Sequence, residues 1–185
     1  MKGGLPIVEF ADAPSFAAWL ARQDGTVTGA WLRFAKKGSG ASTLSQREAI
    51  DCALCEGWID GQAAPLDACF FLVRFTPRRP RSLWSQVNRT RVLELIAVGR
   101  IRPRGLGEVE AAQADGRWDR AYPSARTATV PHDLQVALDG CPVAAVRFDA
   151  FGRAARYAML LGLANARRPE TRRRRIASFL DAAQA

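Results

Sequence analysis

The period of the hydrophobic residues changes once along this chain of 185 residues. Before about residue 125, segments with apolar residues at helical spacing alternate with segments of strand character, whereas after Pro131 every apolar stripe has helical spacing. Residues 117–130, with a proline and several small polar residues, separate the two parts. These patterns predict an α+β fold, with a small sheet and flanking helices in residues 1–125 and an all-helical C-terminal module in residues 126–185. A chain of this length also suits packing of both parts into one compact unit.

Three segments of the first part have strand character. Residues 27–36 alternate, with apolar residues at 30, 32 and 34 on one side, and residues 58–61 predict a short strand that ends in a turn. Residues 68–75 are apolar on both faces almost throughout, which predicts a central strand. Helices are predicted over residues 14–23, 45–56, 85–98, 106–114, 133–138, 142–151, 153–167 and 169–183.

Local signals mark the ends of some of these helices. Ser45 and Glu48 form a capping box, in which each side chain bonds a free backbone N–H of the other residue. Gly57 suits a left-handed residue at the end of that helix. Either Ser82 or Ser85 is expected to cap the helix that ends before Gly99.

The charge balance is basic, with 27 Lys and Arg against 18 Asp and Glu and a formal net charge of +9. Nearly all of the positive charge is arginine, whose planar fork binds a carboxylate or a phosphate with two parallel bonds. A general bias toward arginine codons explains the same composition, so only the placement of the arginines separates the two interpretations. No apolar run approaches the ~20 residues of a membrane span, and Glu9 and Asp12 interrupt the N-terminal apolar stretch. We therefore expect a cytoplasmic protein without membrane partners.

Cysteine and histidine are too few for the chemistry that they most often support. Cys52 and Cys55 form a C-x-x-C near the end of a predicted helix, without a second pair or a nearby histidine to complete a zinc site. The single histidine, His132, falls in a predicted first helical turn and is expected to face solvent. We therefore predict structural cysteines, no metal and no cofactor.

A basic loop is followed directly by a predicted helix start. Four arginines occupy the eight residues from Arg74 to Arg81, and a helix N-terminus adds free N–H groups and partial positive charge. The combination predicts a pocket for a small anionic ligand, although a solvated basic turn with an ordinary cap has the same residues. The predicted ligand-binding residues are Lys36, Trp58, Asp60, Arg74, Thr76, Arg78, Ser82, Trp84, Ser85 and Asn88.

Each predicted pocket residue has a chemical role. The lysine and arginines would hold the negative group, the serines would present donors at the helix terminus, and a tryptophan would supply a stacking wall. Asp60 would orient the arginines, unless it bonds its own backbone in a D-G turn. A carboxylate paired to arginines has a lowered pKa, which favours this orienting role over proton transfer.

Two other functions remain open. The first is an enzyme, such as a lyase, transferase or hydrolase of a phosphorylated or carboxylated substrate, with Asp60 as base or Cys55 as nucleophile. The second is nucleic-acid binding by the arginine helix, through Arg172, Arg173, Arg174 and Arg175. An ion-paired, solubilising helix has the same pattern, and the absence of a base-reading motif argues against sequence-specific binding.

Short words in one order and spacing between residues 27 and 180 match those of a known family. They are WLR at 31–33, AKKGSG at 35–40, EA at 48–49, ALC at 53–55, GWIDGQ at 57–62, RFTPR at 74–78, Ser82, WS at 84–85, Asn88, GRWD at 116–119, TATVP at 127–131, PETR at 169–172 and RI at 175–176. On these words the chain resembles the bacterial YdeI/OmpD-associated, or bacteriocin-protection, family. The resemblance implies an α+β part joined to a helical module and a role in stress or antimicrobial protection. Its words fall on polar residues of the predicted pocket, which favours the pocket over a solvated turn.

Overall fold

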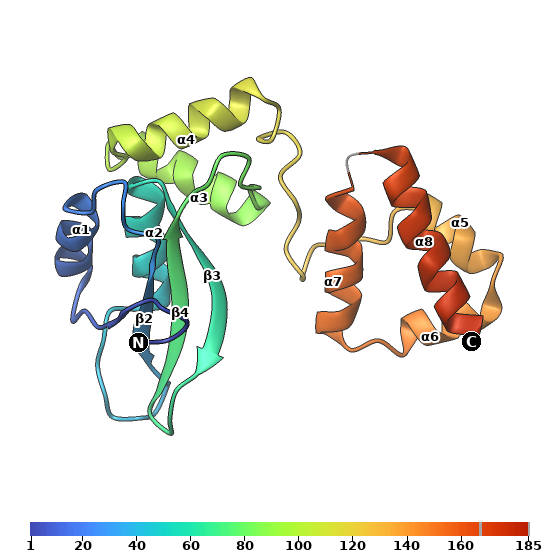
Figure 1. Cartoon of the computed structure of the whole chain (residues 1–185), viewed down its shortest axis with the longest axis horizontal. Helices are drawn as coiled ribbons and strands as arrows, with labels where there is room; N and C mark the ends of the chain where they lie inside the picture. The colour runs from blue at the N-terminus through green and yellow to red at the C-terminus, as the bar shows by residue number, and fades with distance from the viewer. Residues whose placement is uncertain (167, 185) are drawn as a thin grey trace. The chain divides into compact units, whose positions relative to one another are not determined.

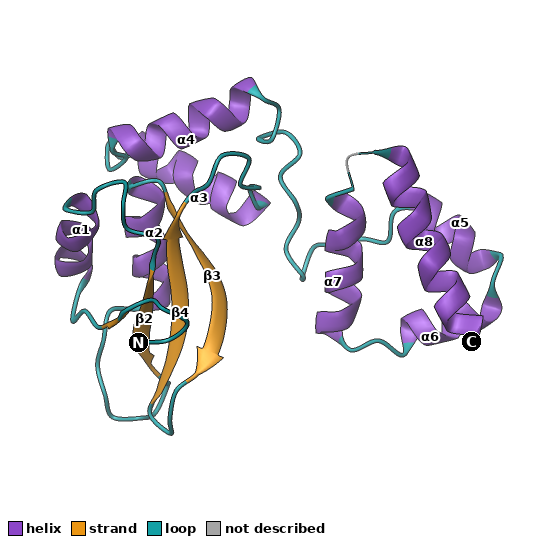
Figure 2. Cartoon of the chain, viewed as in Figure 1, coloured by secondary structure: helices purple, strands orange, loops and turns teal. Residues whose placement is uncertain are grey.

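The computed structural model describes residues 1–166 and 168–184 and has the α+β fold that the sequence predicts. Figure 1 labels the elements and Figure 2 separates helices from strands. In chain order they are β1 (Ile7–Val8), α1 (Ala13–Ala21), β2 (Ala30–Ala35), α2 (Gln46–Cys55), β3 (Trp58–Pro65), β4 (Phe70–Pro77), α3 (Gln86–Ala97), α4 (Pro103–Ala114), α5 (His132–Asp139), α6 (Pro142–Asp149), α7 (Arg153–Ala164) and α8 (Pro169–Gln184).

The chain divides into two compact units. The N-terminal unit comprises residues 1–84 and 88–120, and the C-terminal unit comprises residues 85–87 and 121–185. The sheet and the helices α1, α2 and α4 belong to the first unit, whereas α5 to α8 belong to the second. The predicted end of one helix at Arg167 lies outside the described residues.

The sheet has the strand order β1-β2-β4-β3. The two-residue strand β1, which the sequence analysis missed, pairs parallel with β2, and the other neighbours pair antiparallel. As predicted, β4 is central, because it pairs with β2 on one side and with β3 on the other. Leu72, Val73 and Phe75 of β4 are buried, whereas Arg74 between them is exposed.

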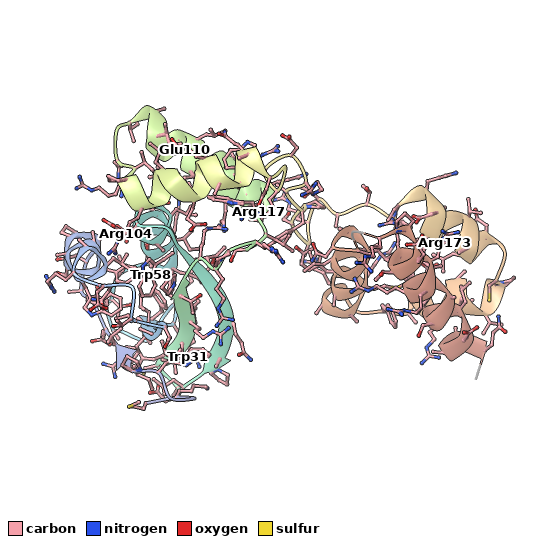
Figure 3. The ribbon with its side chains drawn as sticks, turned by 45° about the horizontal axis from the view of Figure 1, so that its top comes forward. Trp31, Trp58, Arg104, Glu110, Arg117 and Arg173 are labelled. Atoms are coloured by element: carbon pink, nitrogen blue, oxygen red, sulfur yellow. The ribbon has the colours of Figure 1, made fainter. Side chains whose placement is uncertain are left out.

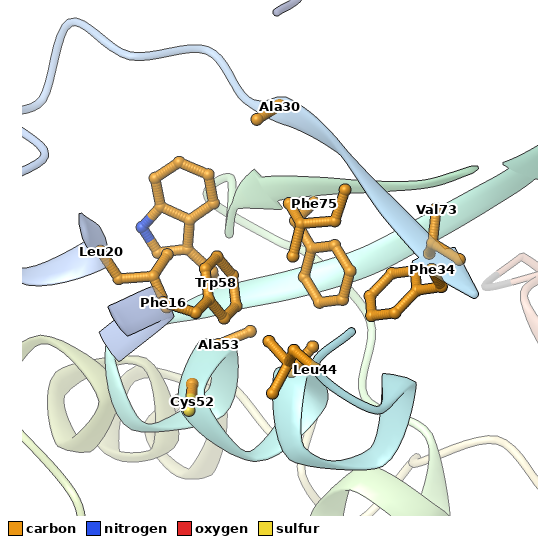
Figure 4. Packing of buried hydrophobic residues seen from close by; sticks show 12 residues of the cluster. Phe16, Leu20, Ala30, Phe34, Leu44, Cys52, Ala53, Trp58, Val73 and Phe75 are labelled. Carbon is orange, nitrogen blue, oxygen red and sulfur yellow. The ribbon is translucent and has the colours of Figure 1, made fainter. Parts of the chain in front are cut away.

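The core of the N-terminal unit lies between one face of the sheet and the helices α1 and α2. Ala30, Leu32 and Phe34 all belong to it, which confirms the predicted inward side of β2. Phe16 of α1 meets the ring of Phe75 of β4 edge-on, with 5.8 Å between ring centroids, and Figure 4 shows this packing from close by.

Two glycines bring the start of α4 against the end of α2. The capping box of Ser45 and Glu48 begins α2 as predicted, and Gly57 follows its end with a φ of +74°. A Cβ on Gly57 would lie 3.1 Å from the backbone oxygen of Arg104, and a Cβ on Gly105 would collide with the backbone oxygen of Cys55. The segment before α4 is therefore held beside the last turn of α2, where Cys55 O accepts from the Arg102 N–H at 3.1 Å.

The strand β3 is longer than predicted and contains no D-G turn. Asp60 and Gly61 lie inside β3, and the pairing with β4 shifts register between Asp60 and Ala63. The prediction of a turn at Asp60 was therefore wrong. The neighbouring strand β4 supplies backbone partners along this segment, and such pairing overrides the local preference of Asp-Gly for a turn.

The C-terminal unit is a four-helix module with its own apolar core. Leu134 of α5, Phe148 of α6, Leu163 of α7 and Ile176 of α8 are among its buried members. His132, the first residue of α5, is exposed, as predicted. None of the described helices combines the length and the apolar character needed to cross a membrane.

Candidate functional site

The structure does not bring Arg74 to Asp60. Asp60 is paired with Phe75 and shares its face of the sheet, whereas side chains alternate along β4, so Arg74 and Thr76 lie on the opposite face. Arg74 is exposed, and its guanidinium lies close to Gly61 of β3. The prediction that Arg74 and Thr76 share one pocket with Asp60 and Arg78 was therefore wrong.

Lys36 also lies apart from the predicted pocket. It follows β2 at the end of the sheet where β4 begins, and its backbone N–H donates to Cys69 O at 2.7 Å. Its Nζ donates to Asp67 O at 2.6 Å. Arg78 follows the other end of β4, roughly 25 Å away at the rise of an extended strand. These two cations therefore do not hold one small ligand together.

Four of the predicted residues do meet, around the guanidinium of Arg78. This side chain is only 6% exposed, lies 3.6 Å above the ring centre of Trp84, and donates from Nη1 to Leu83 O at 3.2 Å. The carboxyl group of Asp60 is hydrogen-bonded to the Asn88 side chain and lies in the field of Arg78. We call Asp60, Arg78, Trp84 and Asn88 the Arg78 cluster.

Burial dominates the protonation of Asp60. It raises the pKa of this carboxyl above its usual value, although the charge of Arg78 and the hydrogen bond from Asn88 act in the opposite direction. The lowered pKa expected for an arginine-paired aspartate was therefore wrong, because the sequence shows the cation but not the loss of water around the acid.

Neither tryptophan of the predicted site offers a stacking wall. Trp58 is 2% exposed and packs edge-on against Trp19 in the core, with 5.7 Å between ring centroids. Trp84 is 1% exposed, with Arg78 over its face and Trp118 against its edge. Both rings are already covered by the protein itself.

The serines before α3 differ in their roles. Ser82 Oγ accepts from the Arg79 N–H at 2.9 Å, so this hydroxyl closes a turn and does not cap the helix. Ser85 is buried and directly precedes Gln86, the first residue of α3. Of the two predicted caps, only Ser85 occupies the capping position.

The sequence analysis missed two ionic residues beside the Arg78 cluster. Arg117 is buried, donates from Nη1 to Ser82 O at 2.8 Å, and is paired with Asp115 through Nε at 2.6 Å. Burial raises the pKa of Glu108, against the opposing charges of Arg78 and Arg117. Arg117 belongs to the GRWD motif at residues 116–119, whereas no sequence pattern marks Glu108. Arg117 is therefore ion-paired with a carboxylate of the protein, and Arg78 lies in the field of Asp60 and Glu108.

A cavity of about 800 Å³ in the N-terminal unit is lined by none of the residues of the Arg78 cluster, and we call it the basic cavity. It is lined by alanines of α1, by the end of α2, and by the segment from Gly99 to Arg104. Its cations are Arg100, Arg102 and Arg104, against a single carboxylate, Glu56. Within the part of the chain that the structure describes, neither Arg100 nor Arg102 has a carboxylate at ion-pair distance.

Two thiols line the basic cavity and are kept protonated. Burial raises the pKa of Cys52 to about 11 and raises that of Cys55, although the nearby charge of Arg100 lowers both. A thiol in this state is a poor nucleophile near neutral pH, because the thiolate is the reactive form. The geometry therefore gives no support to Cys55 as a catalytic nucleophile. Among the described residues, no group of His, Cys, Asp and Glu is placed to hold a metal ion.

Two family models match this chain. One, described as a domain of unknown function (DUF8412), matches residues 8–108, which is more than half of the chain. The other, described as bacteriocin-protection, YdeI or OmpD-associated, matches residues 127–185. The chain belongs to the DUF8412 family and carries a YdeI/OmpD-associated C-terminal module. No curated protein and no solved structure matches it.

The YdeI/OmpD-associated match confirms the resemblance over the helical part. The words that the sequence analysis found before residue 108 fall instead in the DUF8412 domain. The two matches therefore correspond to different units of the structure, and the Arg78 cluster and the basic cavity both belong to the DUF8412 part or follow it closely.

In the YdeI/OmpD-associated module, some of the arginine side chains of α8 form hydrogen bonds within the module. Arg172 donates two bonds to the Asp133 carboxylate and one to Leu163 O, at 2.7 Å. Arg175 donates to Gly162 O in α7. Of the four predicted nucleic-acid contacts, two therefore hold α8 to its neighbours, which reduces the number of charges left to meet phosphates.

Proposed function

We propose that this protein binds a small anionic ligand in the basic cavity, as part of a cytoplasmic role in stress or antimicrobial protection. One observation carries the ligand: three arginine side chains line the cavity against one carboxylate. The similarity of residues 127–185 to the bacteriocin-protection family supports the protective role. The ligand class is the one expected from the sequence, but the arginines that would hold the ligand are different ones.

The size and exposure of the basic cavity favour a ligand over a structural ion pair. Its volume of about 800 Å³ lies within the range of 300–1,000 Å³ that small-molecule sites usually have. Arg100, Arg102 and Arg104 are exposed, and although Arg104 Nη1 donates to Gln23 O at 2.7 Å, water still reaches all three side chains. Arginine forks then bind a phosphate or carboxylate with paired, charge-assisted hydrogen bonds.

The Arg78 cluster is a weaker candidate for the same ligand. An added anion there would compete with Asp60 and Glu108 for one nearly buried guanidinium. It would also have to displace Arg78 from the face of Trp84. Removing a buried ion from its partners costs several kcal/mol, and the free energy of ligand binding would have to offset this cost.

The test uses pyrophosphate as the probe and isothermal titration calorimetry at low salt. The variant Arg100→Ala/Arg102→Ala should bind pyrophosphate about tenfold or more weakly than the native chain, because each charge-assisted hydrogen bond contributes roughly 1.5–3 kcal/mol. The matched control, Arg74→Ala/Arg79→Ala, removes the same charge from two exposed arginines away from the cavity.

The control variant decides between a site and a general charge effect. Native affinity in the control, together with the loss in the cavity variant, supports the proposal. An equal loss in both variants, or no pyrophosphate binding by the native chain, would overturn it.

A further inference from the structure

A second cavity, of about 390 Å³, adjoins the basic cavity. Glu56, Pro103 and Arg104 line both cavities, so they form a shared wall. Beyond this wall the second cavity is lined by Trp58, Glu108 and other residues of the N-terminal unit. Figure 3 labels Arg104 at the start of α4 and Trp58 in the body of the unit.

The helix α4 sets the order of charges along the two cavities. Arg100 and Arg102 precede the helix and line only the basic cavity, Arg104 lines both, and Glu108 lines only the second. Arg104 and Glu108 are four residues apart, so they lie on the same side of α4, about 6 Å apart along its axis. A short ligand can therefore reach from one cavity into the other.

The second cavity presents mainly negative charge. Its carboxylates are those of Asp24, Glu56 and Glu108, against the cations Arg78 and Arg104. Arg78 is nearly buried and stacked on Trp84, and the Nη1 of Arg104 donates to Gln23 O at 2.7 Å.

The C-terminal end of α2 lies at the shared wall, because Cys52, Cys55 and Glu56 also line the basic cavity. Glu56 is the C-cap of α2, and Gly57 follows it in the lining of the second cavity. The carbonyl groups at the end of a helix carry partial negative charge. The lining around Glu108 has three carboxylates and two arginines, whereas the lining around Arg100 has three arginines and one carboxylate.

We propose that the ligand is a small zwitterion, with its anionic group in the basic cavity and an ammonium group beside Glu56 and Glu108 in the second cavity. This inference rests on the proposed function, because it assumes that the anionic group binds near Arg100 and Arg102. An ammonium group offers three donors, which suits a space lined by several carboxylate oxygens. The two cavities together then distinguish ligands by the distance between their charged groups as well as by the sign of each charge.

The test compares two probes that differ only in the ammonium group. Calorimetry should show that the native chain binds 3-aminopropyl phosphate about fivefold more tightly than n-propyl phosphate, the gain of one partly exposed charge pair. In Glu108→Gln, the ratio of the two affinities should fall to about one. The matched control is Glu110→Gln, an exposed glutamate on the same helix that lines neither cavity; Figure 3 labels it.

A variant of a second carboxylate, Glu56, tests the same proposal if Glu108→Gln fails to fold. Glu56→Gln should lower the same ratio, because Glu56 lines the shared wall. Thermal melting of each variant identifies any that fails to fold. A ratio of one in the native chain, or the same reduction in Glu110→Gln as in Glu108→Gln, overturns the zwitterion.

The two proposals fail in different ways. If n-propyl phosphate binds and requires Arg100 and Arg102, but the ammonium group adds nothing, the zwitterion is wrong and the anion site stands. If neither probe binds the native chain, both proposals are wrong.

Discussion

Two arginine-rich segments of the N-terminal unit have similar sequences and different surroundings. The first runs from Arg74 to Arg81 and the second from Arg100 to Arg104. In the first, Arg78 is buried beside carboxyl groups of the protein, and the exposed Arg74 lies on the far face of the sheet. In the second, three exposed arginines line a cavity.

The comparison shows that partners, more than the density of arginines, distinguish a structural cation from a ligand-binding one. A guanidinium that loses its water inside a protein needs a carboxylate or carbonyl partner there, since an unpaired buried charge is very costly. Arg78 has met this requirement within the chain. The exposed arginines of the second segment do not have this requirement, and we propose that Arg100 and Arg102 bind the anion.

The strongest test of this contrast is the stability of Arg78→Ala. Loss of this buried guanidinium leaves Asp60 without its nearby cation and uncovers a face of Trp84, so the free energy of unfolding should fall by about 3 kcal/mol. Arg79→Ala, at the neighbouring exposed position, should change it by less than about 0.5 kcal/mol.

Tryptophan fluorescence during urea unfolding is the appropriate measurement for Arg78→Ala. All five tryptophans lie in the N-terminal unit, so the signal reports on that unit. Equal unfolding midpoints for Arg78→Ala and Arg79→Ala would show that Arg78 is not a structural cation.

A smaller effect is expected for Arg172→Ala in the C-terminal unit. This side chain joins α8 to Asp133 of α5 and to Leu163 O of α7, but it is partly exposed, so its loss should cost about 1 kcal/mol. Arg174→Ala, an exposed position on the same helix, is the control. Far-UV circular dichroism follows the unfolding, and a midpoint for Arg172→Ala as high as that of Arg174→Ala would refute the bracing role.

The smallest effect concerns pH, and its sign differs between the two units. Burial raises the pKa of Asp60, so the folded state binds its proton more tightly than the unfolded state, and the stability from this group falls as pH rises above 3.8. Arg172 lowers the pKa of Asp133, so the stability from that group is present above 3.8 and falls as pH drops below it.

Asp60→Asn separates these two contributions. Asparagine resembles the neutral acid, so the variant should show a flatter decline of stability above pH 4 than the native chain, as measured by tryptophan fluorescence. Asp67→Asn is an exposed control with a carboxyl away from the Arg78 cluster. An unchanged slope in Asp60→Asn would contradict the dominance of burial at this site.

Local patterns predicted much of the fold. The capping box at Ser45, the left-handed Gly57 and the inward side of β2 all appear where the sequence places them, because each depends on residues a few positions apart. The central place of β4 followed from its apolar faces. The length of β3 did not follow, because its second half is extended by pairing with β4 and not by its own residues.

The candidate site was less predictable, and the reason is geometric. Asp60, Arg78 and Asn88 were expected to meet and do so, but the register of β3 against β4 placed Arg74 on the other face. The importance of Glu108 depends on how α4 packs, which no local pattern of α4 reveals.

The amino-acid sequence by itself determined which segments are helices and strands, how several of them begin and end, and the family of the helical module. Only the tertiary structure decided which arginines are enclosed and which line a cavity. Helix and cap signals depend on near neighbours in the chain, whereas the surroundings of Arg78 and Arg100 depend on strand register and on the close approach of α4 to α2 at Gly57 and Gly105.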